Sequence, residues 1–251
     1  MILVSEIRKN NPHQIVKKQH VFPKHSLTRF CNDKGLLIVK YKSGENSFLA
    51  TPSNPVFYAN RLWNEHAESG LMKSIEDEFQ LVVSKLLAEQ ALSEQEHLAI
   101  TKMYALWKFR SEIPERVTES LVLDSSMVYS VDDQDEAERL EKGRIYFFQN
   151  GQLSRQMCVG IALPYAIEKV SIQVGKATTW GIVRAIEGQF IIPDTCPDLV
   201  VIPVSPSVML TAKMPSADVG LNVVDEFNHH FIKLCKKYYF AHPDFRYKQS
   251  R

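Results

Sequence analysis

The chain has 251 residues and a mass of 28.8 kDa, with 30 Lys and Arg residues against 29 Asp and Glu residues, so its formal net charge is +1. With 45% hydrophobic and 24% charged residues, it has the composition of a soluble globular protein, and its length suits one large domain or two small ones. The near-neutral total excludes a chain that coats nucleic acid or an acidic membrane with its whole surface, but it permits a local basic patch.

The N-terminal sequence and the cysteines indicate a cytoplasmic protein. The longest apolar run near the start covers only residues 2–4, whereas a secretory signal needs roughly 7–15 apolar residues. No window approaches the roughly 18 apolar residues of a membrane-spanning helix. The four cysteines are scattered without a C-x-x-C pair, which favours reduced, buried thiols over a disulfide or a zinc site.

Charge is distributed unevenly along the chain. Residues 1–30 and residues 227–251 each hold six Lys and Arg residues against one acid, a local charge of +5 at either end. Residues 124–142 hold seven acids against two basic residues, a local charge of −5. If the two ends meet in the fold, they form one basic face; the alternative is two unrelated, solvated ends. The acidic stretch predicts a solvated loop or short exposed helix, with a partner-binding segment as the alternative.

The first half of the chain predicts a hairpin followed by two helices. Residues 36–41 and 47–49, with a turn between them, have the β-branched and apolar pattern of a short hairpin. An apolar stripe predicts a helix over 71–87. A capping box at Ser93-Glu94-Gln95-Glu96 begins a second helix, which Pro114 ends. We expect these two helices to form an antiparallel pair.

The second half changes to strand-like patterns. Residues 145–148 precede Asn150-Gly151, a strong hairpin turn. Further strands are predicted at 168–174, 179–186, 189–193, 199–204 and 207–212, and one long helix over 218–241. The expected fold class is α+β, with an antiparallel sheet packed against a helical pair and a long C-terminal helix. We expect a single domain over 1–251, with a helical part at 52–115 and a mainly β part at 145–212.

Polar residues at positions that favour apolar ones are the candidate site residues, since no nucleotide-binding glycine loop, G-x-S-x-G or H-E-x-x-H motif is present. His20, with His25 five residues later among cations, predicts a general acid or base or a phosphate contact; the alternative is a turn histidine bonded to the backbone. Arg110 continues a buried helical stripe, so it needs an anion, either from an acidic side chain or from a ligand phosphate.

Two further candidates follow later in the chain. Asp194 ends a predicted strand before a proline turn, which suits a catalytic carboxylate but also an ordinary turn. Asn228 lies on the apolar face of the last helix and would either cap a strand end or bind substrate. Arg61 and His66 have the R-x4-H spacing of some metal-independent RNases, a spacing that is frequent by chance.

These positions together resemble a bacterial family of domains of unknown function. Its members open with H-x-x-P-x-x-x-L-x-x-F, which His20, Pro23, Leu27 and Phe30 match. The family's Arg-Thr-Pro element is similar to residues 110–114, its T-S-D-N-P and P-L-S-P segments are similar to residues 192–197 and 203–206, and the inward Asn of its last helix corresponds to Asn228. Two departures matter: Pro193 stands in place of the family's Ser, and one residue is inserted after Asp194. The resemblance covers roughly residues 17–242 and implies one compact domain, but no particular reaction.

The leading functional hypothesis is a nuclease-like effector that acts on RNA or DNA, in a bacterial anti-phage defence or toxin setting. His20 would act as general acid or base, Arg110 would hold the phosphate, Asp194 would orient His20 or bind a divalent metal, and Asn228 would position the substrate. Substrate contacts are predicted for the basic residues Lys17, Lys18, Lys24, His25 and Arg29. The alternative is a non-catalytic binding or interaction module, in which the same polar residues form a structural network. No cofactor is expected beyond that metal, and the partners would be nucleic acid or a protein, not a membrane.

Overall fold

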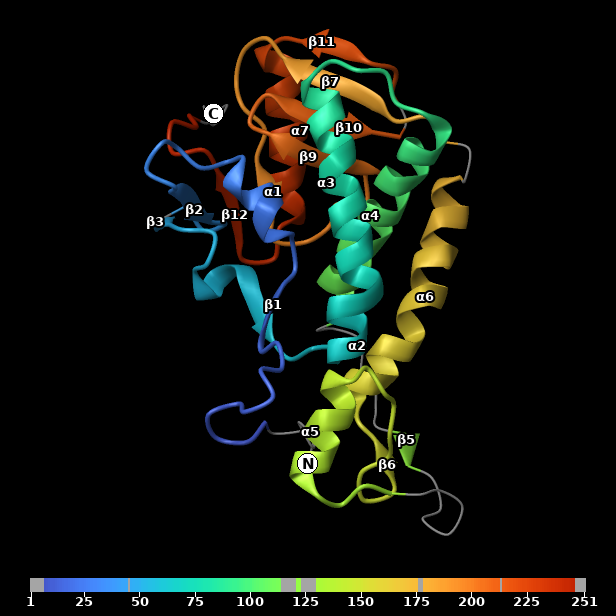
Figure 1. The fold of residues 1–251 in the computed structure, drawn as a ribbon. Helices are drawn as coiled ribbons and strands as arrows, with labels where there is room; N and C mark the ends of the chain where they lie inside the picture. Colours follow the sequence, from blue (N-terminus) through green and yellow to red (C-terminus); the bar gives the residue numbers. More distant parts are fainter. Residues whose placement is uncertain are drawn as a thin grey trace.

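The protein has an α+β fold, seen in a computed structural model that describes residues 7–44, 46–113, 121–122, 130–175, 178–212 and 214–246. Figure 1 shows two sheets beside an upright group of helices, with a smaller helix-and-loop region below them. The helices are α1 (Lys24–Thr28), α2 (Glu65–Ala67), α3 (Lys73–Leu87), α4 (Glu94–Glu112), α5 (Gln134–Lys142), α6 (Arg155–Val174) and α7 (Leu221–Leu234). A 3-10 turn covers Pro55–Phe57, and a π-helical turn, Glu68–Met72, leads into α3.

Two four-stranded sheets carry most of the β structure. The first has the order β11 (Ala217–Val219), β7 (Gly181–Ala185), β10 (Val208–Thr211), β9 (Val201–Ser205), and only its β11–β7 pair is parallel. The second is antiparallel, in the order β3 (Ser47–Ala50), β2 (Leu37–Tyr41), β12 (Tyr238–Ala241), β8 (Ile192–Pro193). Two small ribbons pair β1 (Lys18–His20) with β4 (Tyr58–Asn60) and β5 (Leu121–Val122) with β6 (Gln152–Leu153).

The hairpin and the helix pair confirm the local predictions. Strands β2 and β3 pair antiparallel across the predicted turn. Ser93 caps α4 by accepting a hydrogen bond from the Glu96 amide, and the Glu96 side chain accepts one from the Ser93 amide, so the capping box is complete. Helices α3 and α4 pack against each other along the upright group in Figure 1. The predicted helix stop at Pro114 lies outside the described residues.

The predicted strand 168–174 is wrong, because these residues form the end of α6. Its β-branched residues suggested a strand, but burial in α6 recurs at Val159, Leu163, Ile167 and Ser171, every fourth residue, which is helical spacing. The side chain of Ser154 accepts a hydrogen bond from the Met157 amide and begins the helix 14 residues before the predicted strand. Residues 145–148 are also not a strand; only Phe148 makes an isolated bridge, although the Asn150-Gly151 turn is present with positive φ at both residues.

The predicted helix 218–241 is too long at both ends. Residues 217–219 form β11, and α7 ends at Leu234, where Cys235 leaves the helical region with ψ 143°. The chain then enters β12, whose aromatic residues pair with both β2 and β8. The β structure therefore forms two sheets, and the second one is built mainly from the early hairpin and from β12 near the end of the chain.

The core is divided into two hydrophobic clusters. The larger one lies among α3, α4, α6 and the strands that face them, and includes Phe79, Trp107 and Trp180. The smaller one lies under α7 and includes Phe190 and Phe231. All four cysteines are free.

Candidate functional site

His20 is held by the backbone of the loop opposite. Its Nε2 donates to the carbonyl oxygen of Pro52 at 3.0 Å, and its ring packs edge-on against Tyr58. Burial lowers the pKa of His20, and the positive charges of Lys24 and Arg110 lower it further, against the opposing effect of the Pro52 bond. The ring is therefore neutral at neutral pH, with Nε2 carrying its proton.

Arg110 is fully enclosed and its anion comes from the protein. Its side chain is 2% exposed; it forms an ion pair with Glu76 of α3, and lies 4.0 Å from a carboxylate oxygen of Glu68. The guanidinium also stacks over the ring of Trp63, 5.1 Å from its centroid. Of the two partners predicted for Arg110, an acidic side chain occupies the position rather than a ligand phosphate.

Asp194 organises the chain between α7 and β12. Its carboxylate accepts hydrogen bonds from the amides of Lys236 and Lys237 at 2.7 Å each, and from the amide of Tyr238 at 3.2 Å. Three backbone donors use most of the roughly four acceptor sites of a carboxylate. Asp194 also borders a small cavity with Phe22 and other apolar side chains, whose free volume of about 20 Å³ is roughly the room of one water molecule.

Asn228 joins α7 to the loop before β8. It is 0% exposed; its Oδ1 accepts from the amide of Ile191 at 3.1 Å, and its Nδ2 donates to the carbonyl of Gln189 at 2.8 Å. Both groups of the side-chain amide are thus bonded to backbone, which corresponds to the strand-capping alternative.

The structure brings these four residues together only in part. His20 and Arg110 lie close enough for the charge of one to affect the pKa of the other. Asp194 borders a cavity that Phe22 and Trp107 also line, but neither His20 nor Arg110 is among the residues that line it. Asn228 lies apart, in the cluster under α7. No hydrogen bond or ion pair links any two of the four in the described part of the chain.

Most of the basic residues predicted to contact substrate are exposed, unlike the four candidate catalytic residues. Lys17, Lys18, Lys24 and His25 are exposed on β1, α1 and the residue before β1, and no carboxylate pairs with any of them among the residues described. Lys18 places its ammonium group over the ring of Tyr58, 5.2 Å from the centroid. Only Arg29 is half-buried, where it donates to Gln80 at 2.6 Å. The outermost parts of both basic ends, residues 1–6 and 247–251, lie outside the described part.

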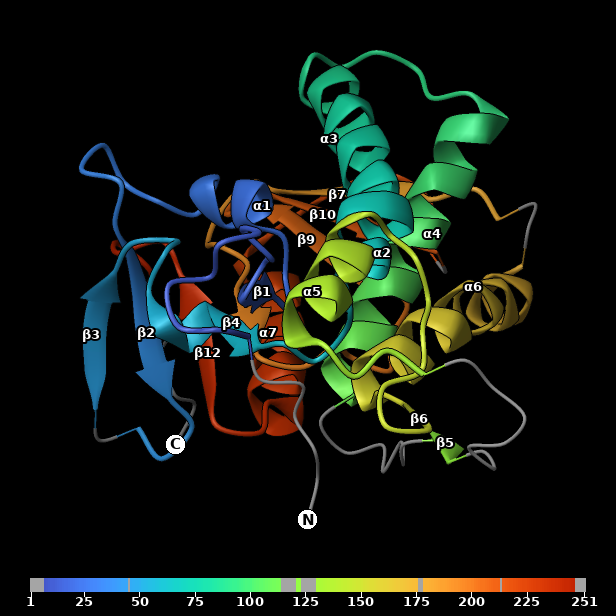
Figure 2. The ribbon, with the colours of Figure 1, turned by 60° about the horizontal axis from the view of Figure 1, so that its bottom comes forward.

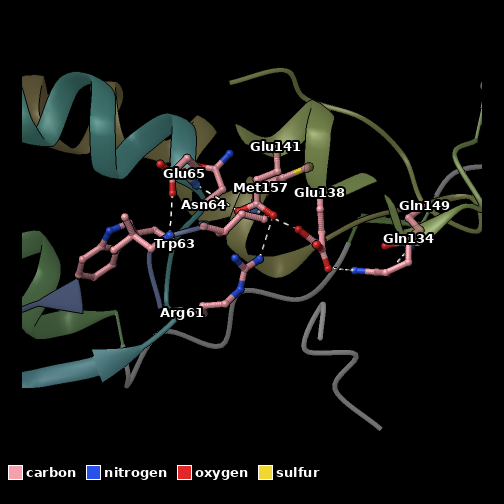
Figure 3. Close-up of polar contacts among 12 residues, drawn as sticks. Arg61, Trp63, Asn64, Glu65, Gln134, Glu138, Glu141, Gln149 and Met157 are labelled. Carbon is pink, nitrogen blue, oxygen red and sulfur yellow. Dashed lines mark hydrogen bonds and ion pairs between the residues drawn. The ribbon is translucent and has the colours of Figure 1, made fainter. Parts of the chain in front are cut away.

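A second polar cluster, which sequence reasoning did not assemble, lies between α2, α5 and the start of the chain (Figure 3). Arg61 and Glu141 form a buried ion pair at 2.9 Å, with side chains 8% and 7% exposed. Glu141 also accepts from the Glu65 amide at 3.2 Å. Arg61 adopts a left-handed conformation, with φ 48°, that aims its side chain inward from a turn.

The acids of α5 also bind the N-terminal segment. Glu138, 2% exposed, accepts from the amide of Arg8 at 2.6 Å and from its guanidinium at 3.3 Å. Burial raises the pKa of Glu138, but the hydrogen bonds from Arg8 and Gln134 outweigh burial and leave the pKa lowered. Asp135 pairs with both Arg8 and His13. The helix expected in the acidic stretch is present at Gln134–Lys142, but two of its acids are buried; residues 124–129 lie outside the described part.

Lys142 also belongs to this second polar cluster. Its ammonium group donates to the carbonyl of Gln14 at 3.0 Å and to Glu65 at 2.8 Å, while the other oxygen of Glu65 accepts from the amide of Val16 at 2.9 Å. The acidic stretch therefore neutralises part of the basic N-terminus. The i, i+3 spacing of Glu138 and Glu141 beside Ala137 was the available signal for an inward acidic face on α5.

The second polar cluster does not form a substrate pocket. The cleft lined by Arg61, Glu138, Glu141 and Met157 has a free volume of about 10 Å³, less than a small ligand needs. The Arg61-x4-His66 spacing does not form one site, because Arg61 pairs with Glu141 whereas Nδ1 of His66 donates to the carbonyl of Arg144 at 2.6 Å. Across the described residues, no group of three or more His, Cys, Asp or Glu side chains is arranged to hold a metal ion.

Comparison with known proteins gives no family assignment. No protein-family model, no curated protein and no solved structure matches the chain. The resemblance based on His20, Pro23, Leu27 and Phe30 therefore stays a prediction.

Proposed function

We propose that the protein is a non-catalytic nucleic-acid-binding module, in which the predicted catalytic residues support the fold and the predicted substrate contacts bind the phosphate backbone. The observation that carries this proposal is the difference in exposure within one predicted set. His20, Arg110, Asp194 and Asn228 all bond to protein groups, while Lys17, Lys18, Lys24 and His25 are exposed and pair with no carboxylate of the described residues.

The bonds made by the first group support a structural role. A residue that stabilises a transition state needs donors or acceptors left over for the substrate. Arg110 is enclosed and pairs with Glu76, and Asp194 already accepts hydrogen bonds from three backbone amides. The adjacent cavity of about 20 Å³ does not accommodate a nucleotide. A substrate would have to displace existing contacts before it reached either charge.

The exposed cations suit a polyanion. Lys17, Lys18, Lys24 and His25 lie within nine residues of each other in sequence, on β1, on α1 and at the residue before β1. Nucleic acid binds such cations through counterion release, which requires no pocket. Lys237, exposed beside β12, adds a cation from the other basic segment. Residues of that segment do meet the first one, since Phe22 and Phe240 line the same cavity.

The test is binding of fluorescently labelled single-stranded RNA and DNA as a function of salt. We expect the Lys17→Gln/Lys24→Gln variant to bind about tenfold more weakly at low salt, with the slope of log K against log salt reduced by ~1.4 for two lost phosphate contacts. The matched control is Lys73→Gln/Lys85→Gln, which removes two exposed cations that already pair with Asp77 and Glu96. Equal weakening in both variants, or no binding by the wild type, would overturn the proposal.

A nuclease-like effector is the second candidate, and one observation favours it. His20 is a neutral imidazole oriented by the Pro52 carbonyl, and its lowered pKa means that the unprotonated ring, the form that acts as a general base, is present at neutral pH. Labelled RNA and DNA should be incubated with the protein, with and without Mg²⁺ or Mn²⁺. Cleavage that His20→Ala abolishes at unchanged Tm would establish this candidate and refute a non-catalytic role.

A further inference from the structure

Helix α6 has an apolar outer face that no described element covers. Ile161, Tyr165 and Ile172 are 53%, 73% and 60% exposed, and with Glu168 they lie at i, i+4, i+7 and i+11. At 100° per residue these four positions lie within about 60° of one another around the helix axis. Figures 1 and 2 show α6 at the margin of the molecule, with α4 on its inner side.

The inner face of α6 belongs to the core and fixes the orientation of the outer one. Leu163 and Ile167 are buried against the α4 side, where α6 makes its main packing contact. By length and composition α6 is the one described helix that passes as a membrane span, but a core helix passes the same test and 39% of its most apolar window is buried. Its apolar character thus divides into a face that packs inside and a stripe that faces out.

We propose that this stripe binds the same stripe of a second copy of the chain, with the two α6 helices antiparallel across a two-fold axis. The stripe is chemically symmetric about its midpoint, between residues 166 and 167. Antiparallel pairing about that point places Ile161 opposite Ile172 of the other copy, and Tyr165 opposite Glu168. Each apolar end meets an apolar end, and each phenol meets a carboxylate that can accept its hydrogen bond.

Charge supports the same arrangement. In this register Lys169 of one copy lies about four residues, roughly 6 Å along the axis, from the position of Glu168 of the other. That spacing is within the reach of a lysine side chain, and it occurs twice because of the two-fold axis. Parallel pairing about the same stripe would instead place Glu168 against Glu168. The sequence of α6 is thus complementary to itself in only one of the two directions.

The experiment measures the molar mass in solution by sedimentation equilibrium over a range of concentrations. We expect wild-type chains to reach twice the 28.8 kDa monomer mass as concentration rises. Tyr165→Glu places a carboxylate against Glu168 of the other copy at two symmetric positions, and should raise the dimer dissociation constant ~100-fold. The control is Leu81→Glu on α3, since Leu81 is also 70% exposed, and it should leave the dissociation constant unchanged.

A rescue variant tests the direction of pairing. In the antiparallel register, Tyr165→Glu/Glu168→Lys sets the new carboxylate of one copy opposite the new ammonium group of the other, so dimerisation should return to within about tenfold of the wild type. In a parallel pair the same change leaves like charges opposed, and no rescue follows. Wild-type chains that remain monomeric at submillimolar concentration, or rescue that fails while both variants stay folded by circular dichroism, would overturn the proposal. Cosedimentation of the monomer with anionic lipid vesicles, lost in Tyr165→Glu, would assign the stripe to a membrane surface instead.

Discussion

Arg110 and Arg61 are both buried arginines whose positive charge is paired with a carboxylate, but the surroundings of the two pairs differ. Each is less than a tenth exposed and each pairs with a carboxylate. Arg110 extends from α4 to Glu76 on the neighbouring helix, and Glu76 is still 26% exposed. Arg61 extends from a turn to Glu141, which is only 7% exposed and lies 80 residues away.

This difference shows why the burial of Arg110 was predicted from the sequence and the burial of Arg61 was not. Arg110 interrupts a helical apolar stripe, so its burial follows from local periodicity. Arg61 belongs to no periodic pattern, and its burial depends on α5 closing over it. The energetics should differ in the same way, because a partner that still reaches water can be rehydrated when its arginine is removed, whereas a fully buried partner cannot.

The largest effect is expected for Arg61→Met. Removing this guanidinium leaves Glu141 buried without its counterion, which should lower the free energy of unfolding by about 3–5 kcal/mol. Urea unfolding followed by circular dichroism measures the change. The double variant Arg61→Met/Glu141→Met removes both charges and should recover most of the loss. A loss below about 1 kcal/mol for the single variant would contradict the role assigned to this pair.

Arg110→Met should cost less, about 2–3 kcal/mol, since Glu76 remains partly in contact with water and methionine keeps the apolar contact with Trp63. The same unfolding experiment compares it directly with Arg61→Met. If Arg110→Met were the more destabilising of the two, the exposure of the partner would not be what distinguishes the two sites.

Asn228→Ala extends the comparison to a neutral group. It leaves the amide of Ile191 and the carbonyl of Gln189 unpaired beneath α7, at an expected cost of about 2 kcal/mol. Asn222, exposed on the same helix, provides the control, and Asn222→Ala should change stability by less than about 0.5 kcal/mol. Equal effects at both positions would show that the hydrogen bonds of Asn228 contribute nothing beyond helix propensity.

The smallest effect is expected for the titration of His20. Its pKa is lowered in the folded state, mainly by burial, so the unfolded chain binds the proton more readily. The stability contributed by neutral His20 is therefore complete above about pH 6.5 and is lost as pH falls below that value. Unfolding midpoints of the wild type should decline between pH 7 and pH 5 more steeply than those of His20→Gln. Parallel pH profiles would refute this assignment.

Local signals predicted the fold class and several elements correctly. The β2–β3 hairpin, the capping box of α4 and the α3–α4 pair each depend on residues within a few positions of one another. The failures occur where distant contacts overrode local preference. The β-branched end of α6 is helical because α4 covers its inner face, and α7 stops early because Asp194 binds the three amides that follow it.

For the candidate site, too, local sequence pattern predicted some features and distant contacts decided the others. Local pattern predicted that Arg110 and Asn228 are inward polar residues, because each one interrupts an apolar helical stripe, and it offered a backbone-bonded turn as one alternative for His20. It did not predict what each would bind, since Pro52, Glu76 and Gln189 lie 32, 34 and 39 residues away. Whether such a residue is catalytic or structural depends on the partner, and the partner is a property of the fold.

The sequence alone determined the positions of the charged segments, the hairpin and the helix pair, because turns, caps and amphipathic stripes act over one or two turns of chain. Only the tertiary structure decided which charges remain available to a ligand. The guanidinium of Arg8 pairs with Glu138, 130 residues away, so part of the basic N-terminus is neutralised by the acidic stretch. The near-neutral total of +1 does not show which charges are paired inside the molecule, whereas the structure leaves Lys17, Lys18 and Lys24 exposed, with no carboxylate of the described residues paired to them.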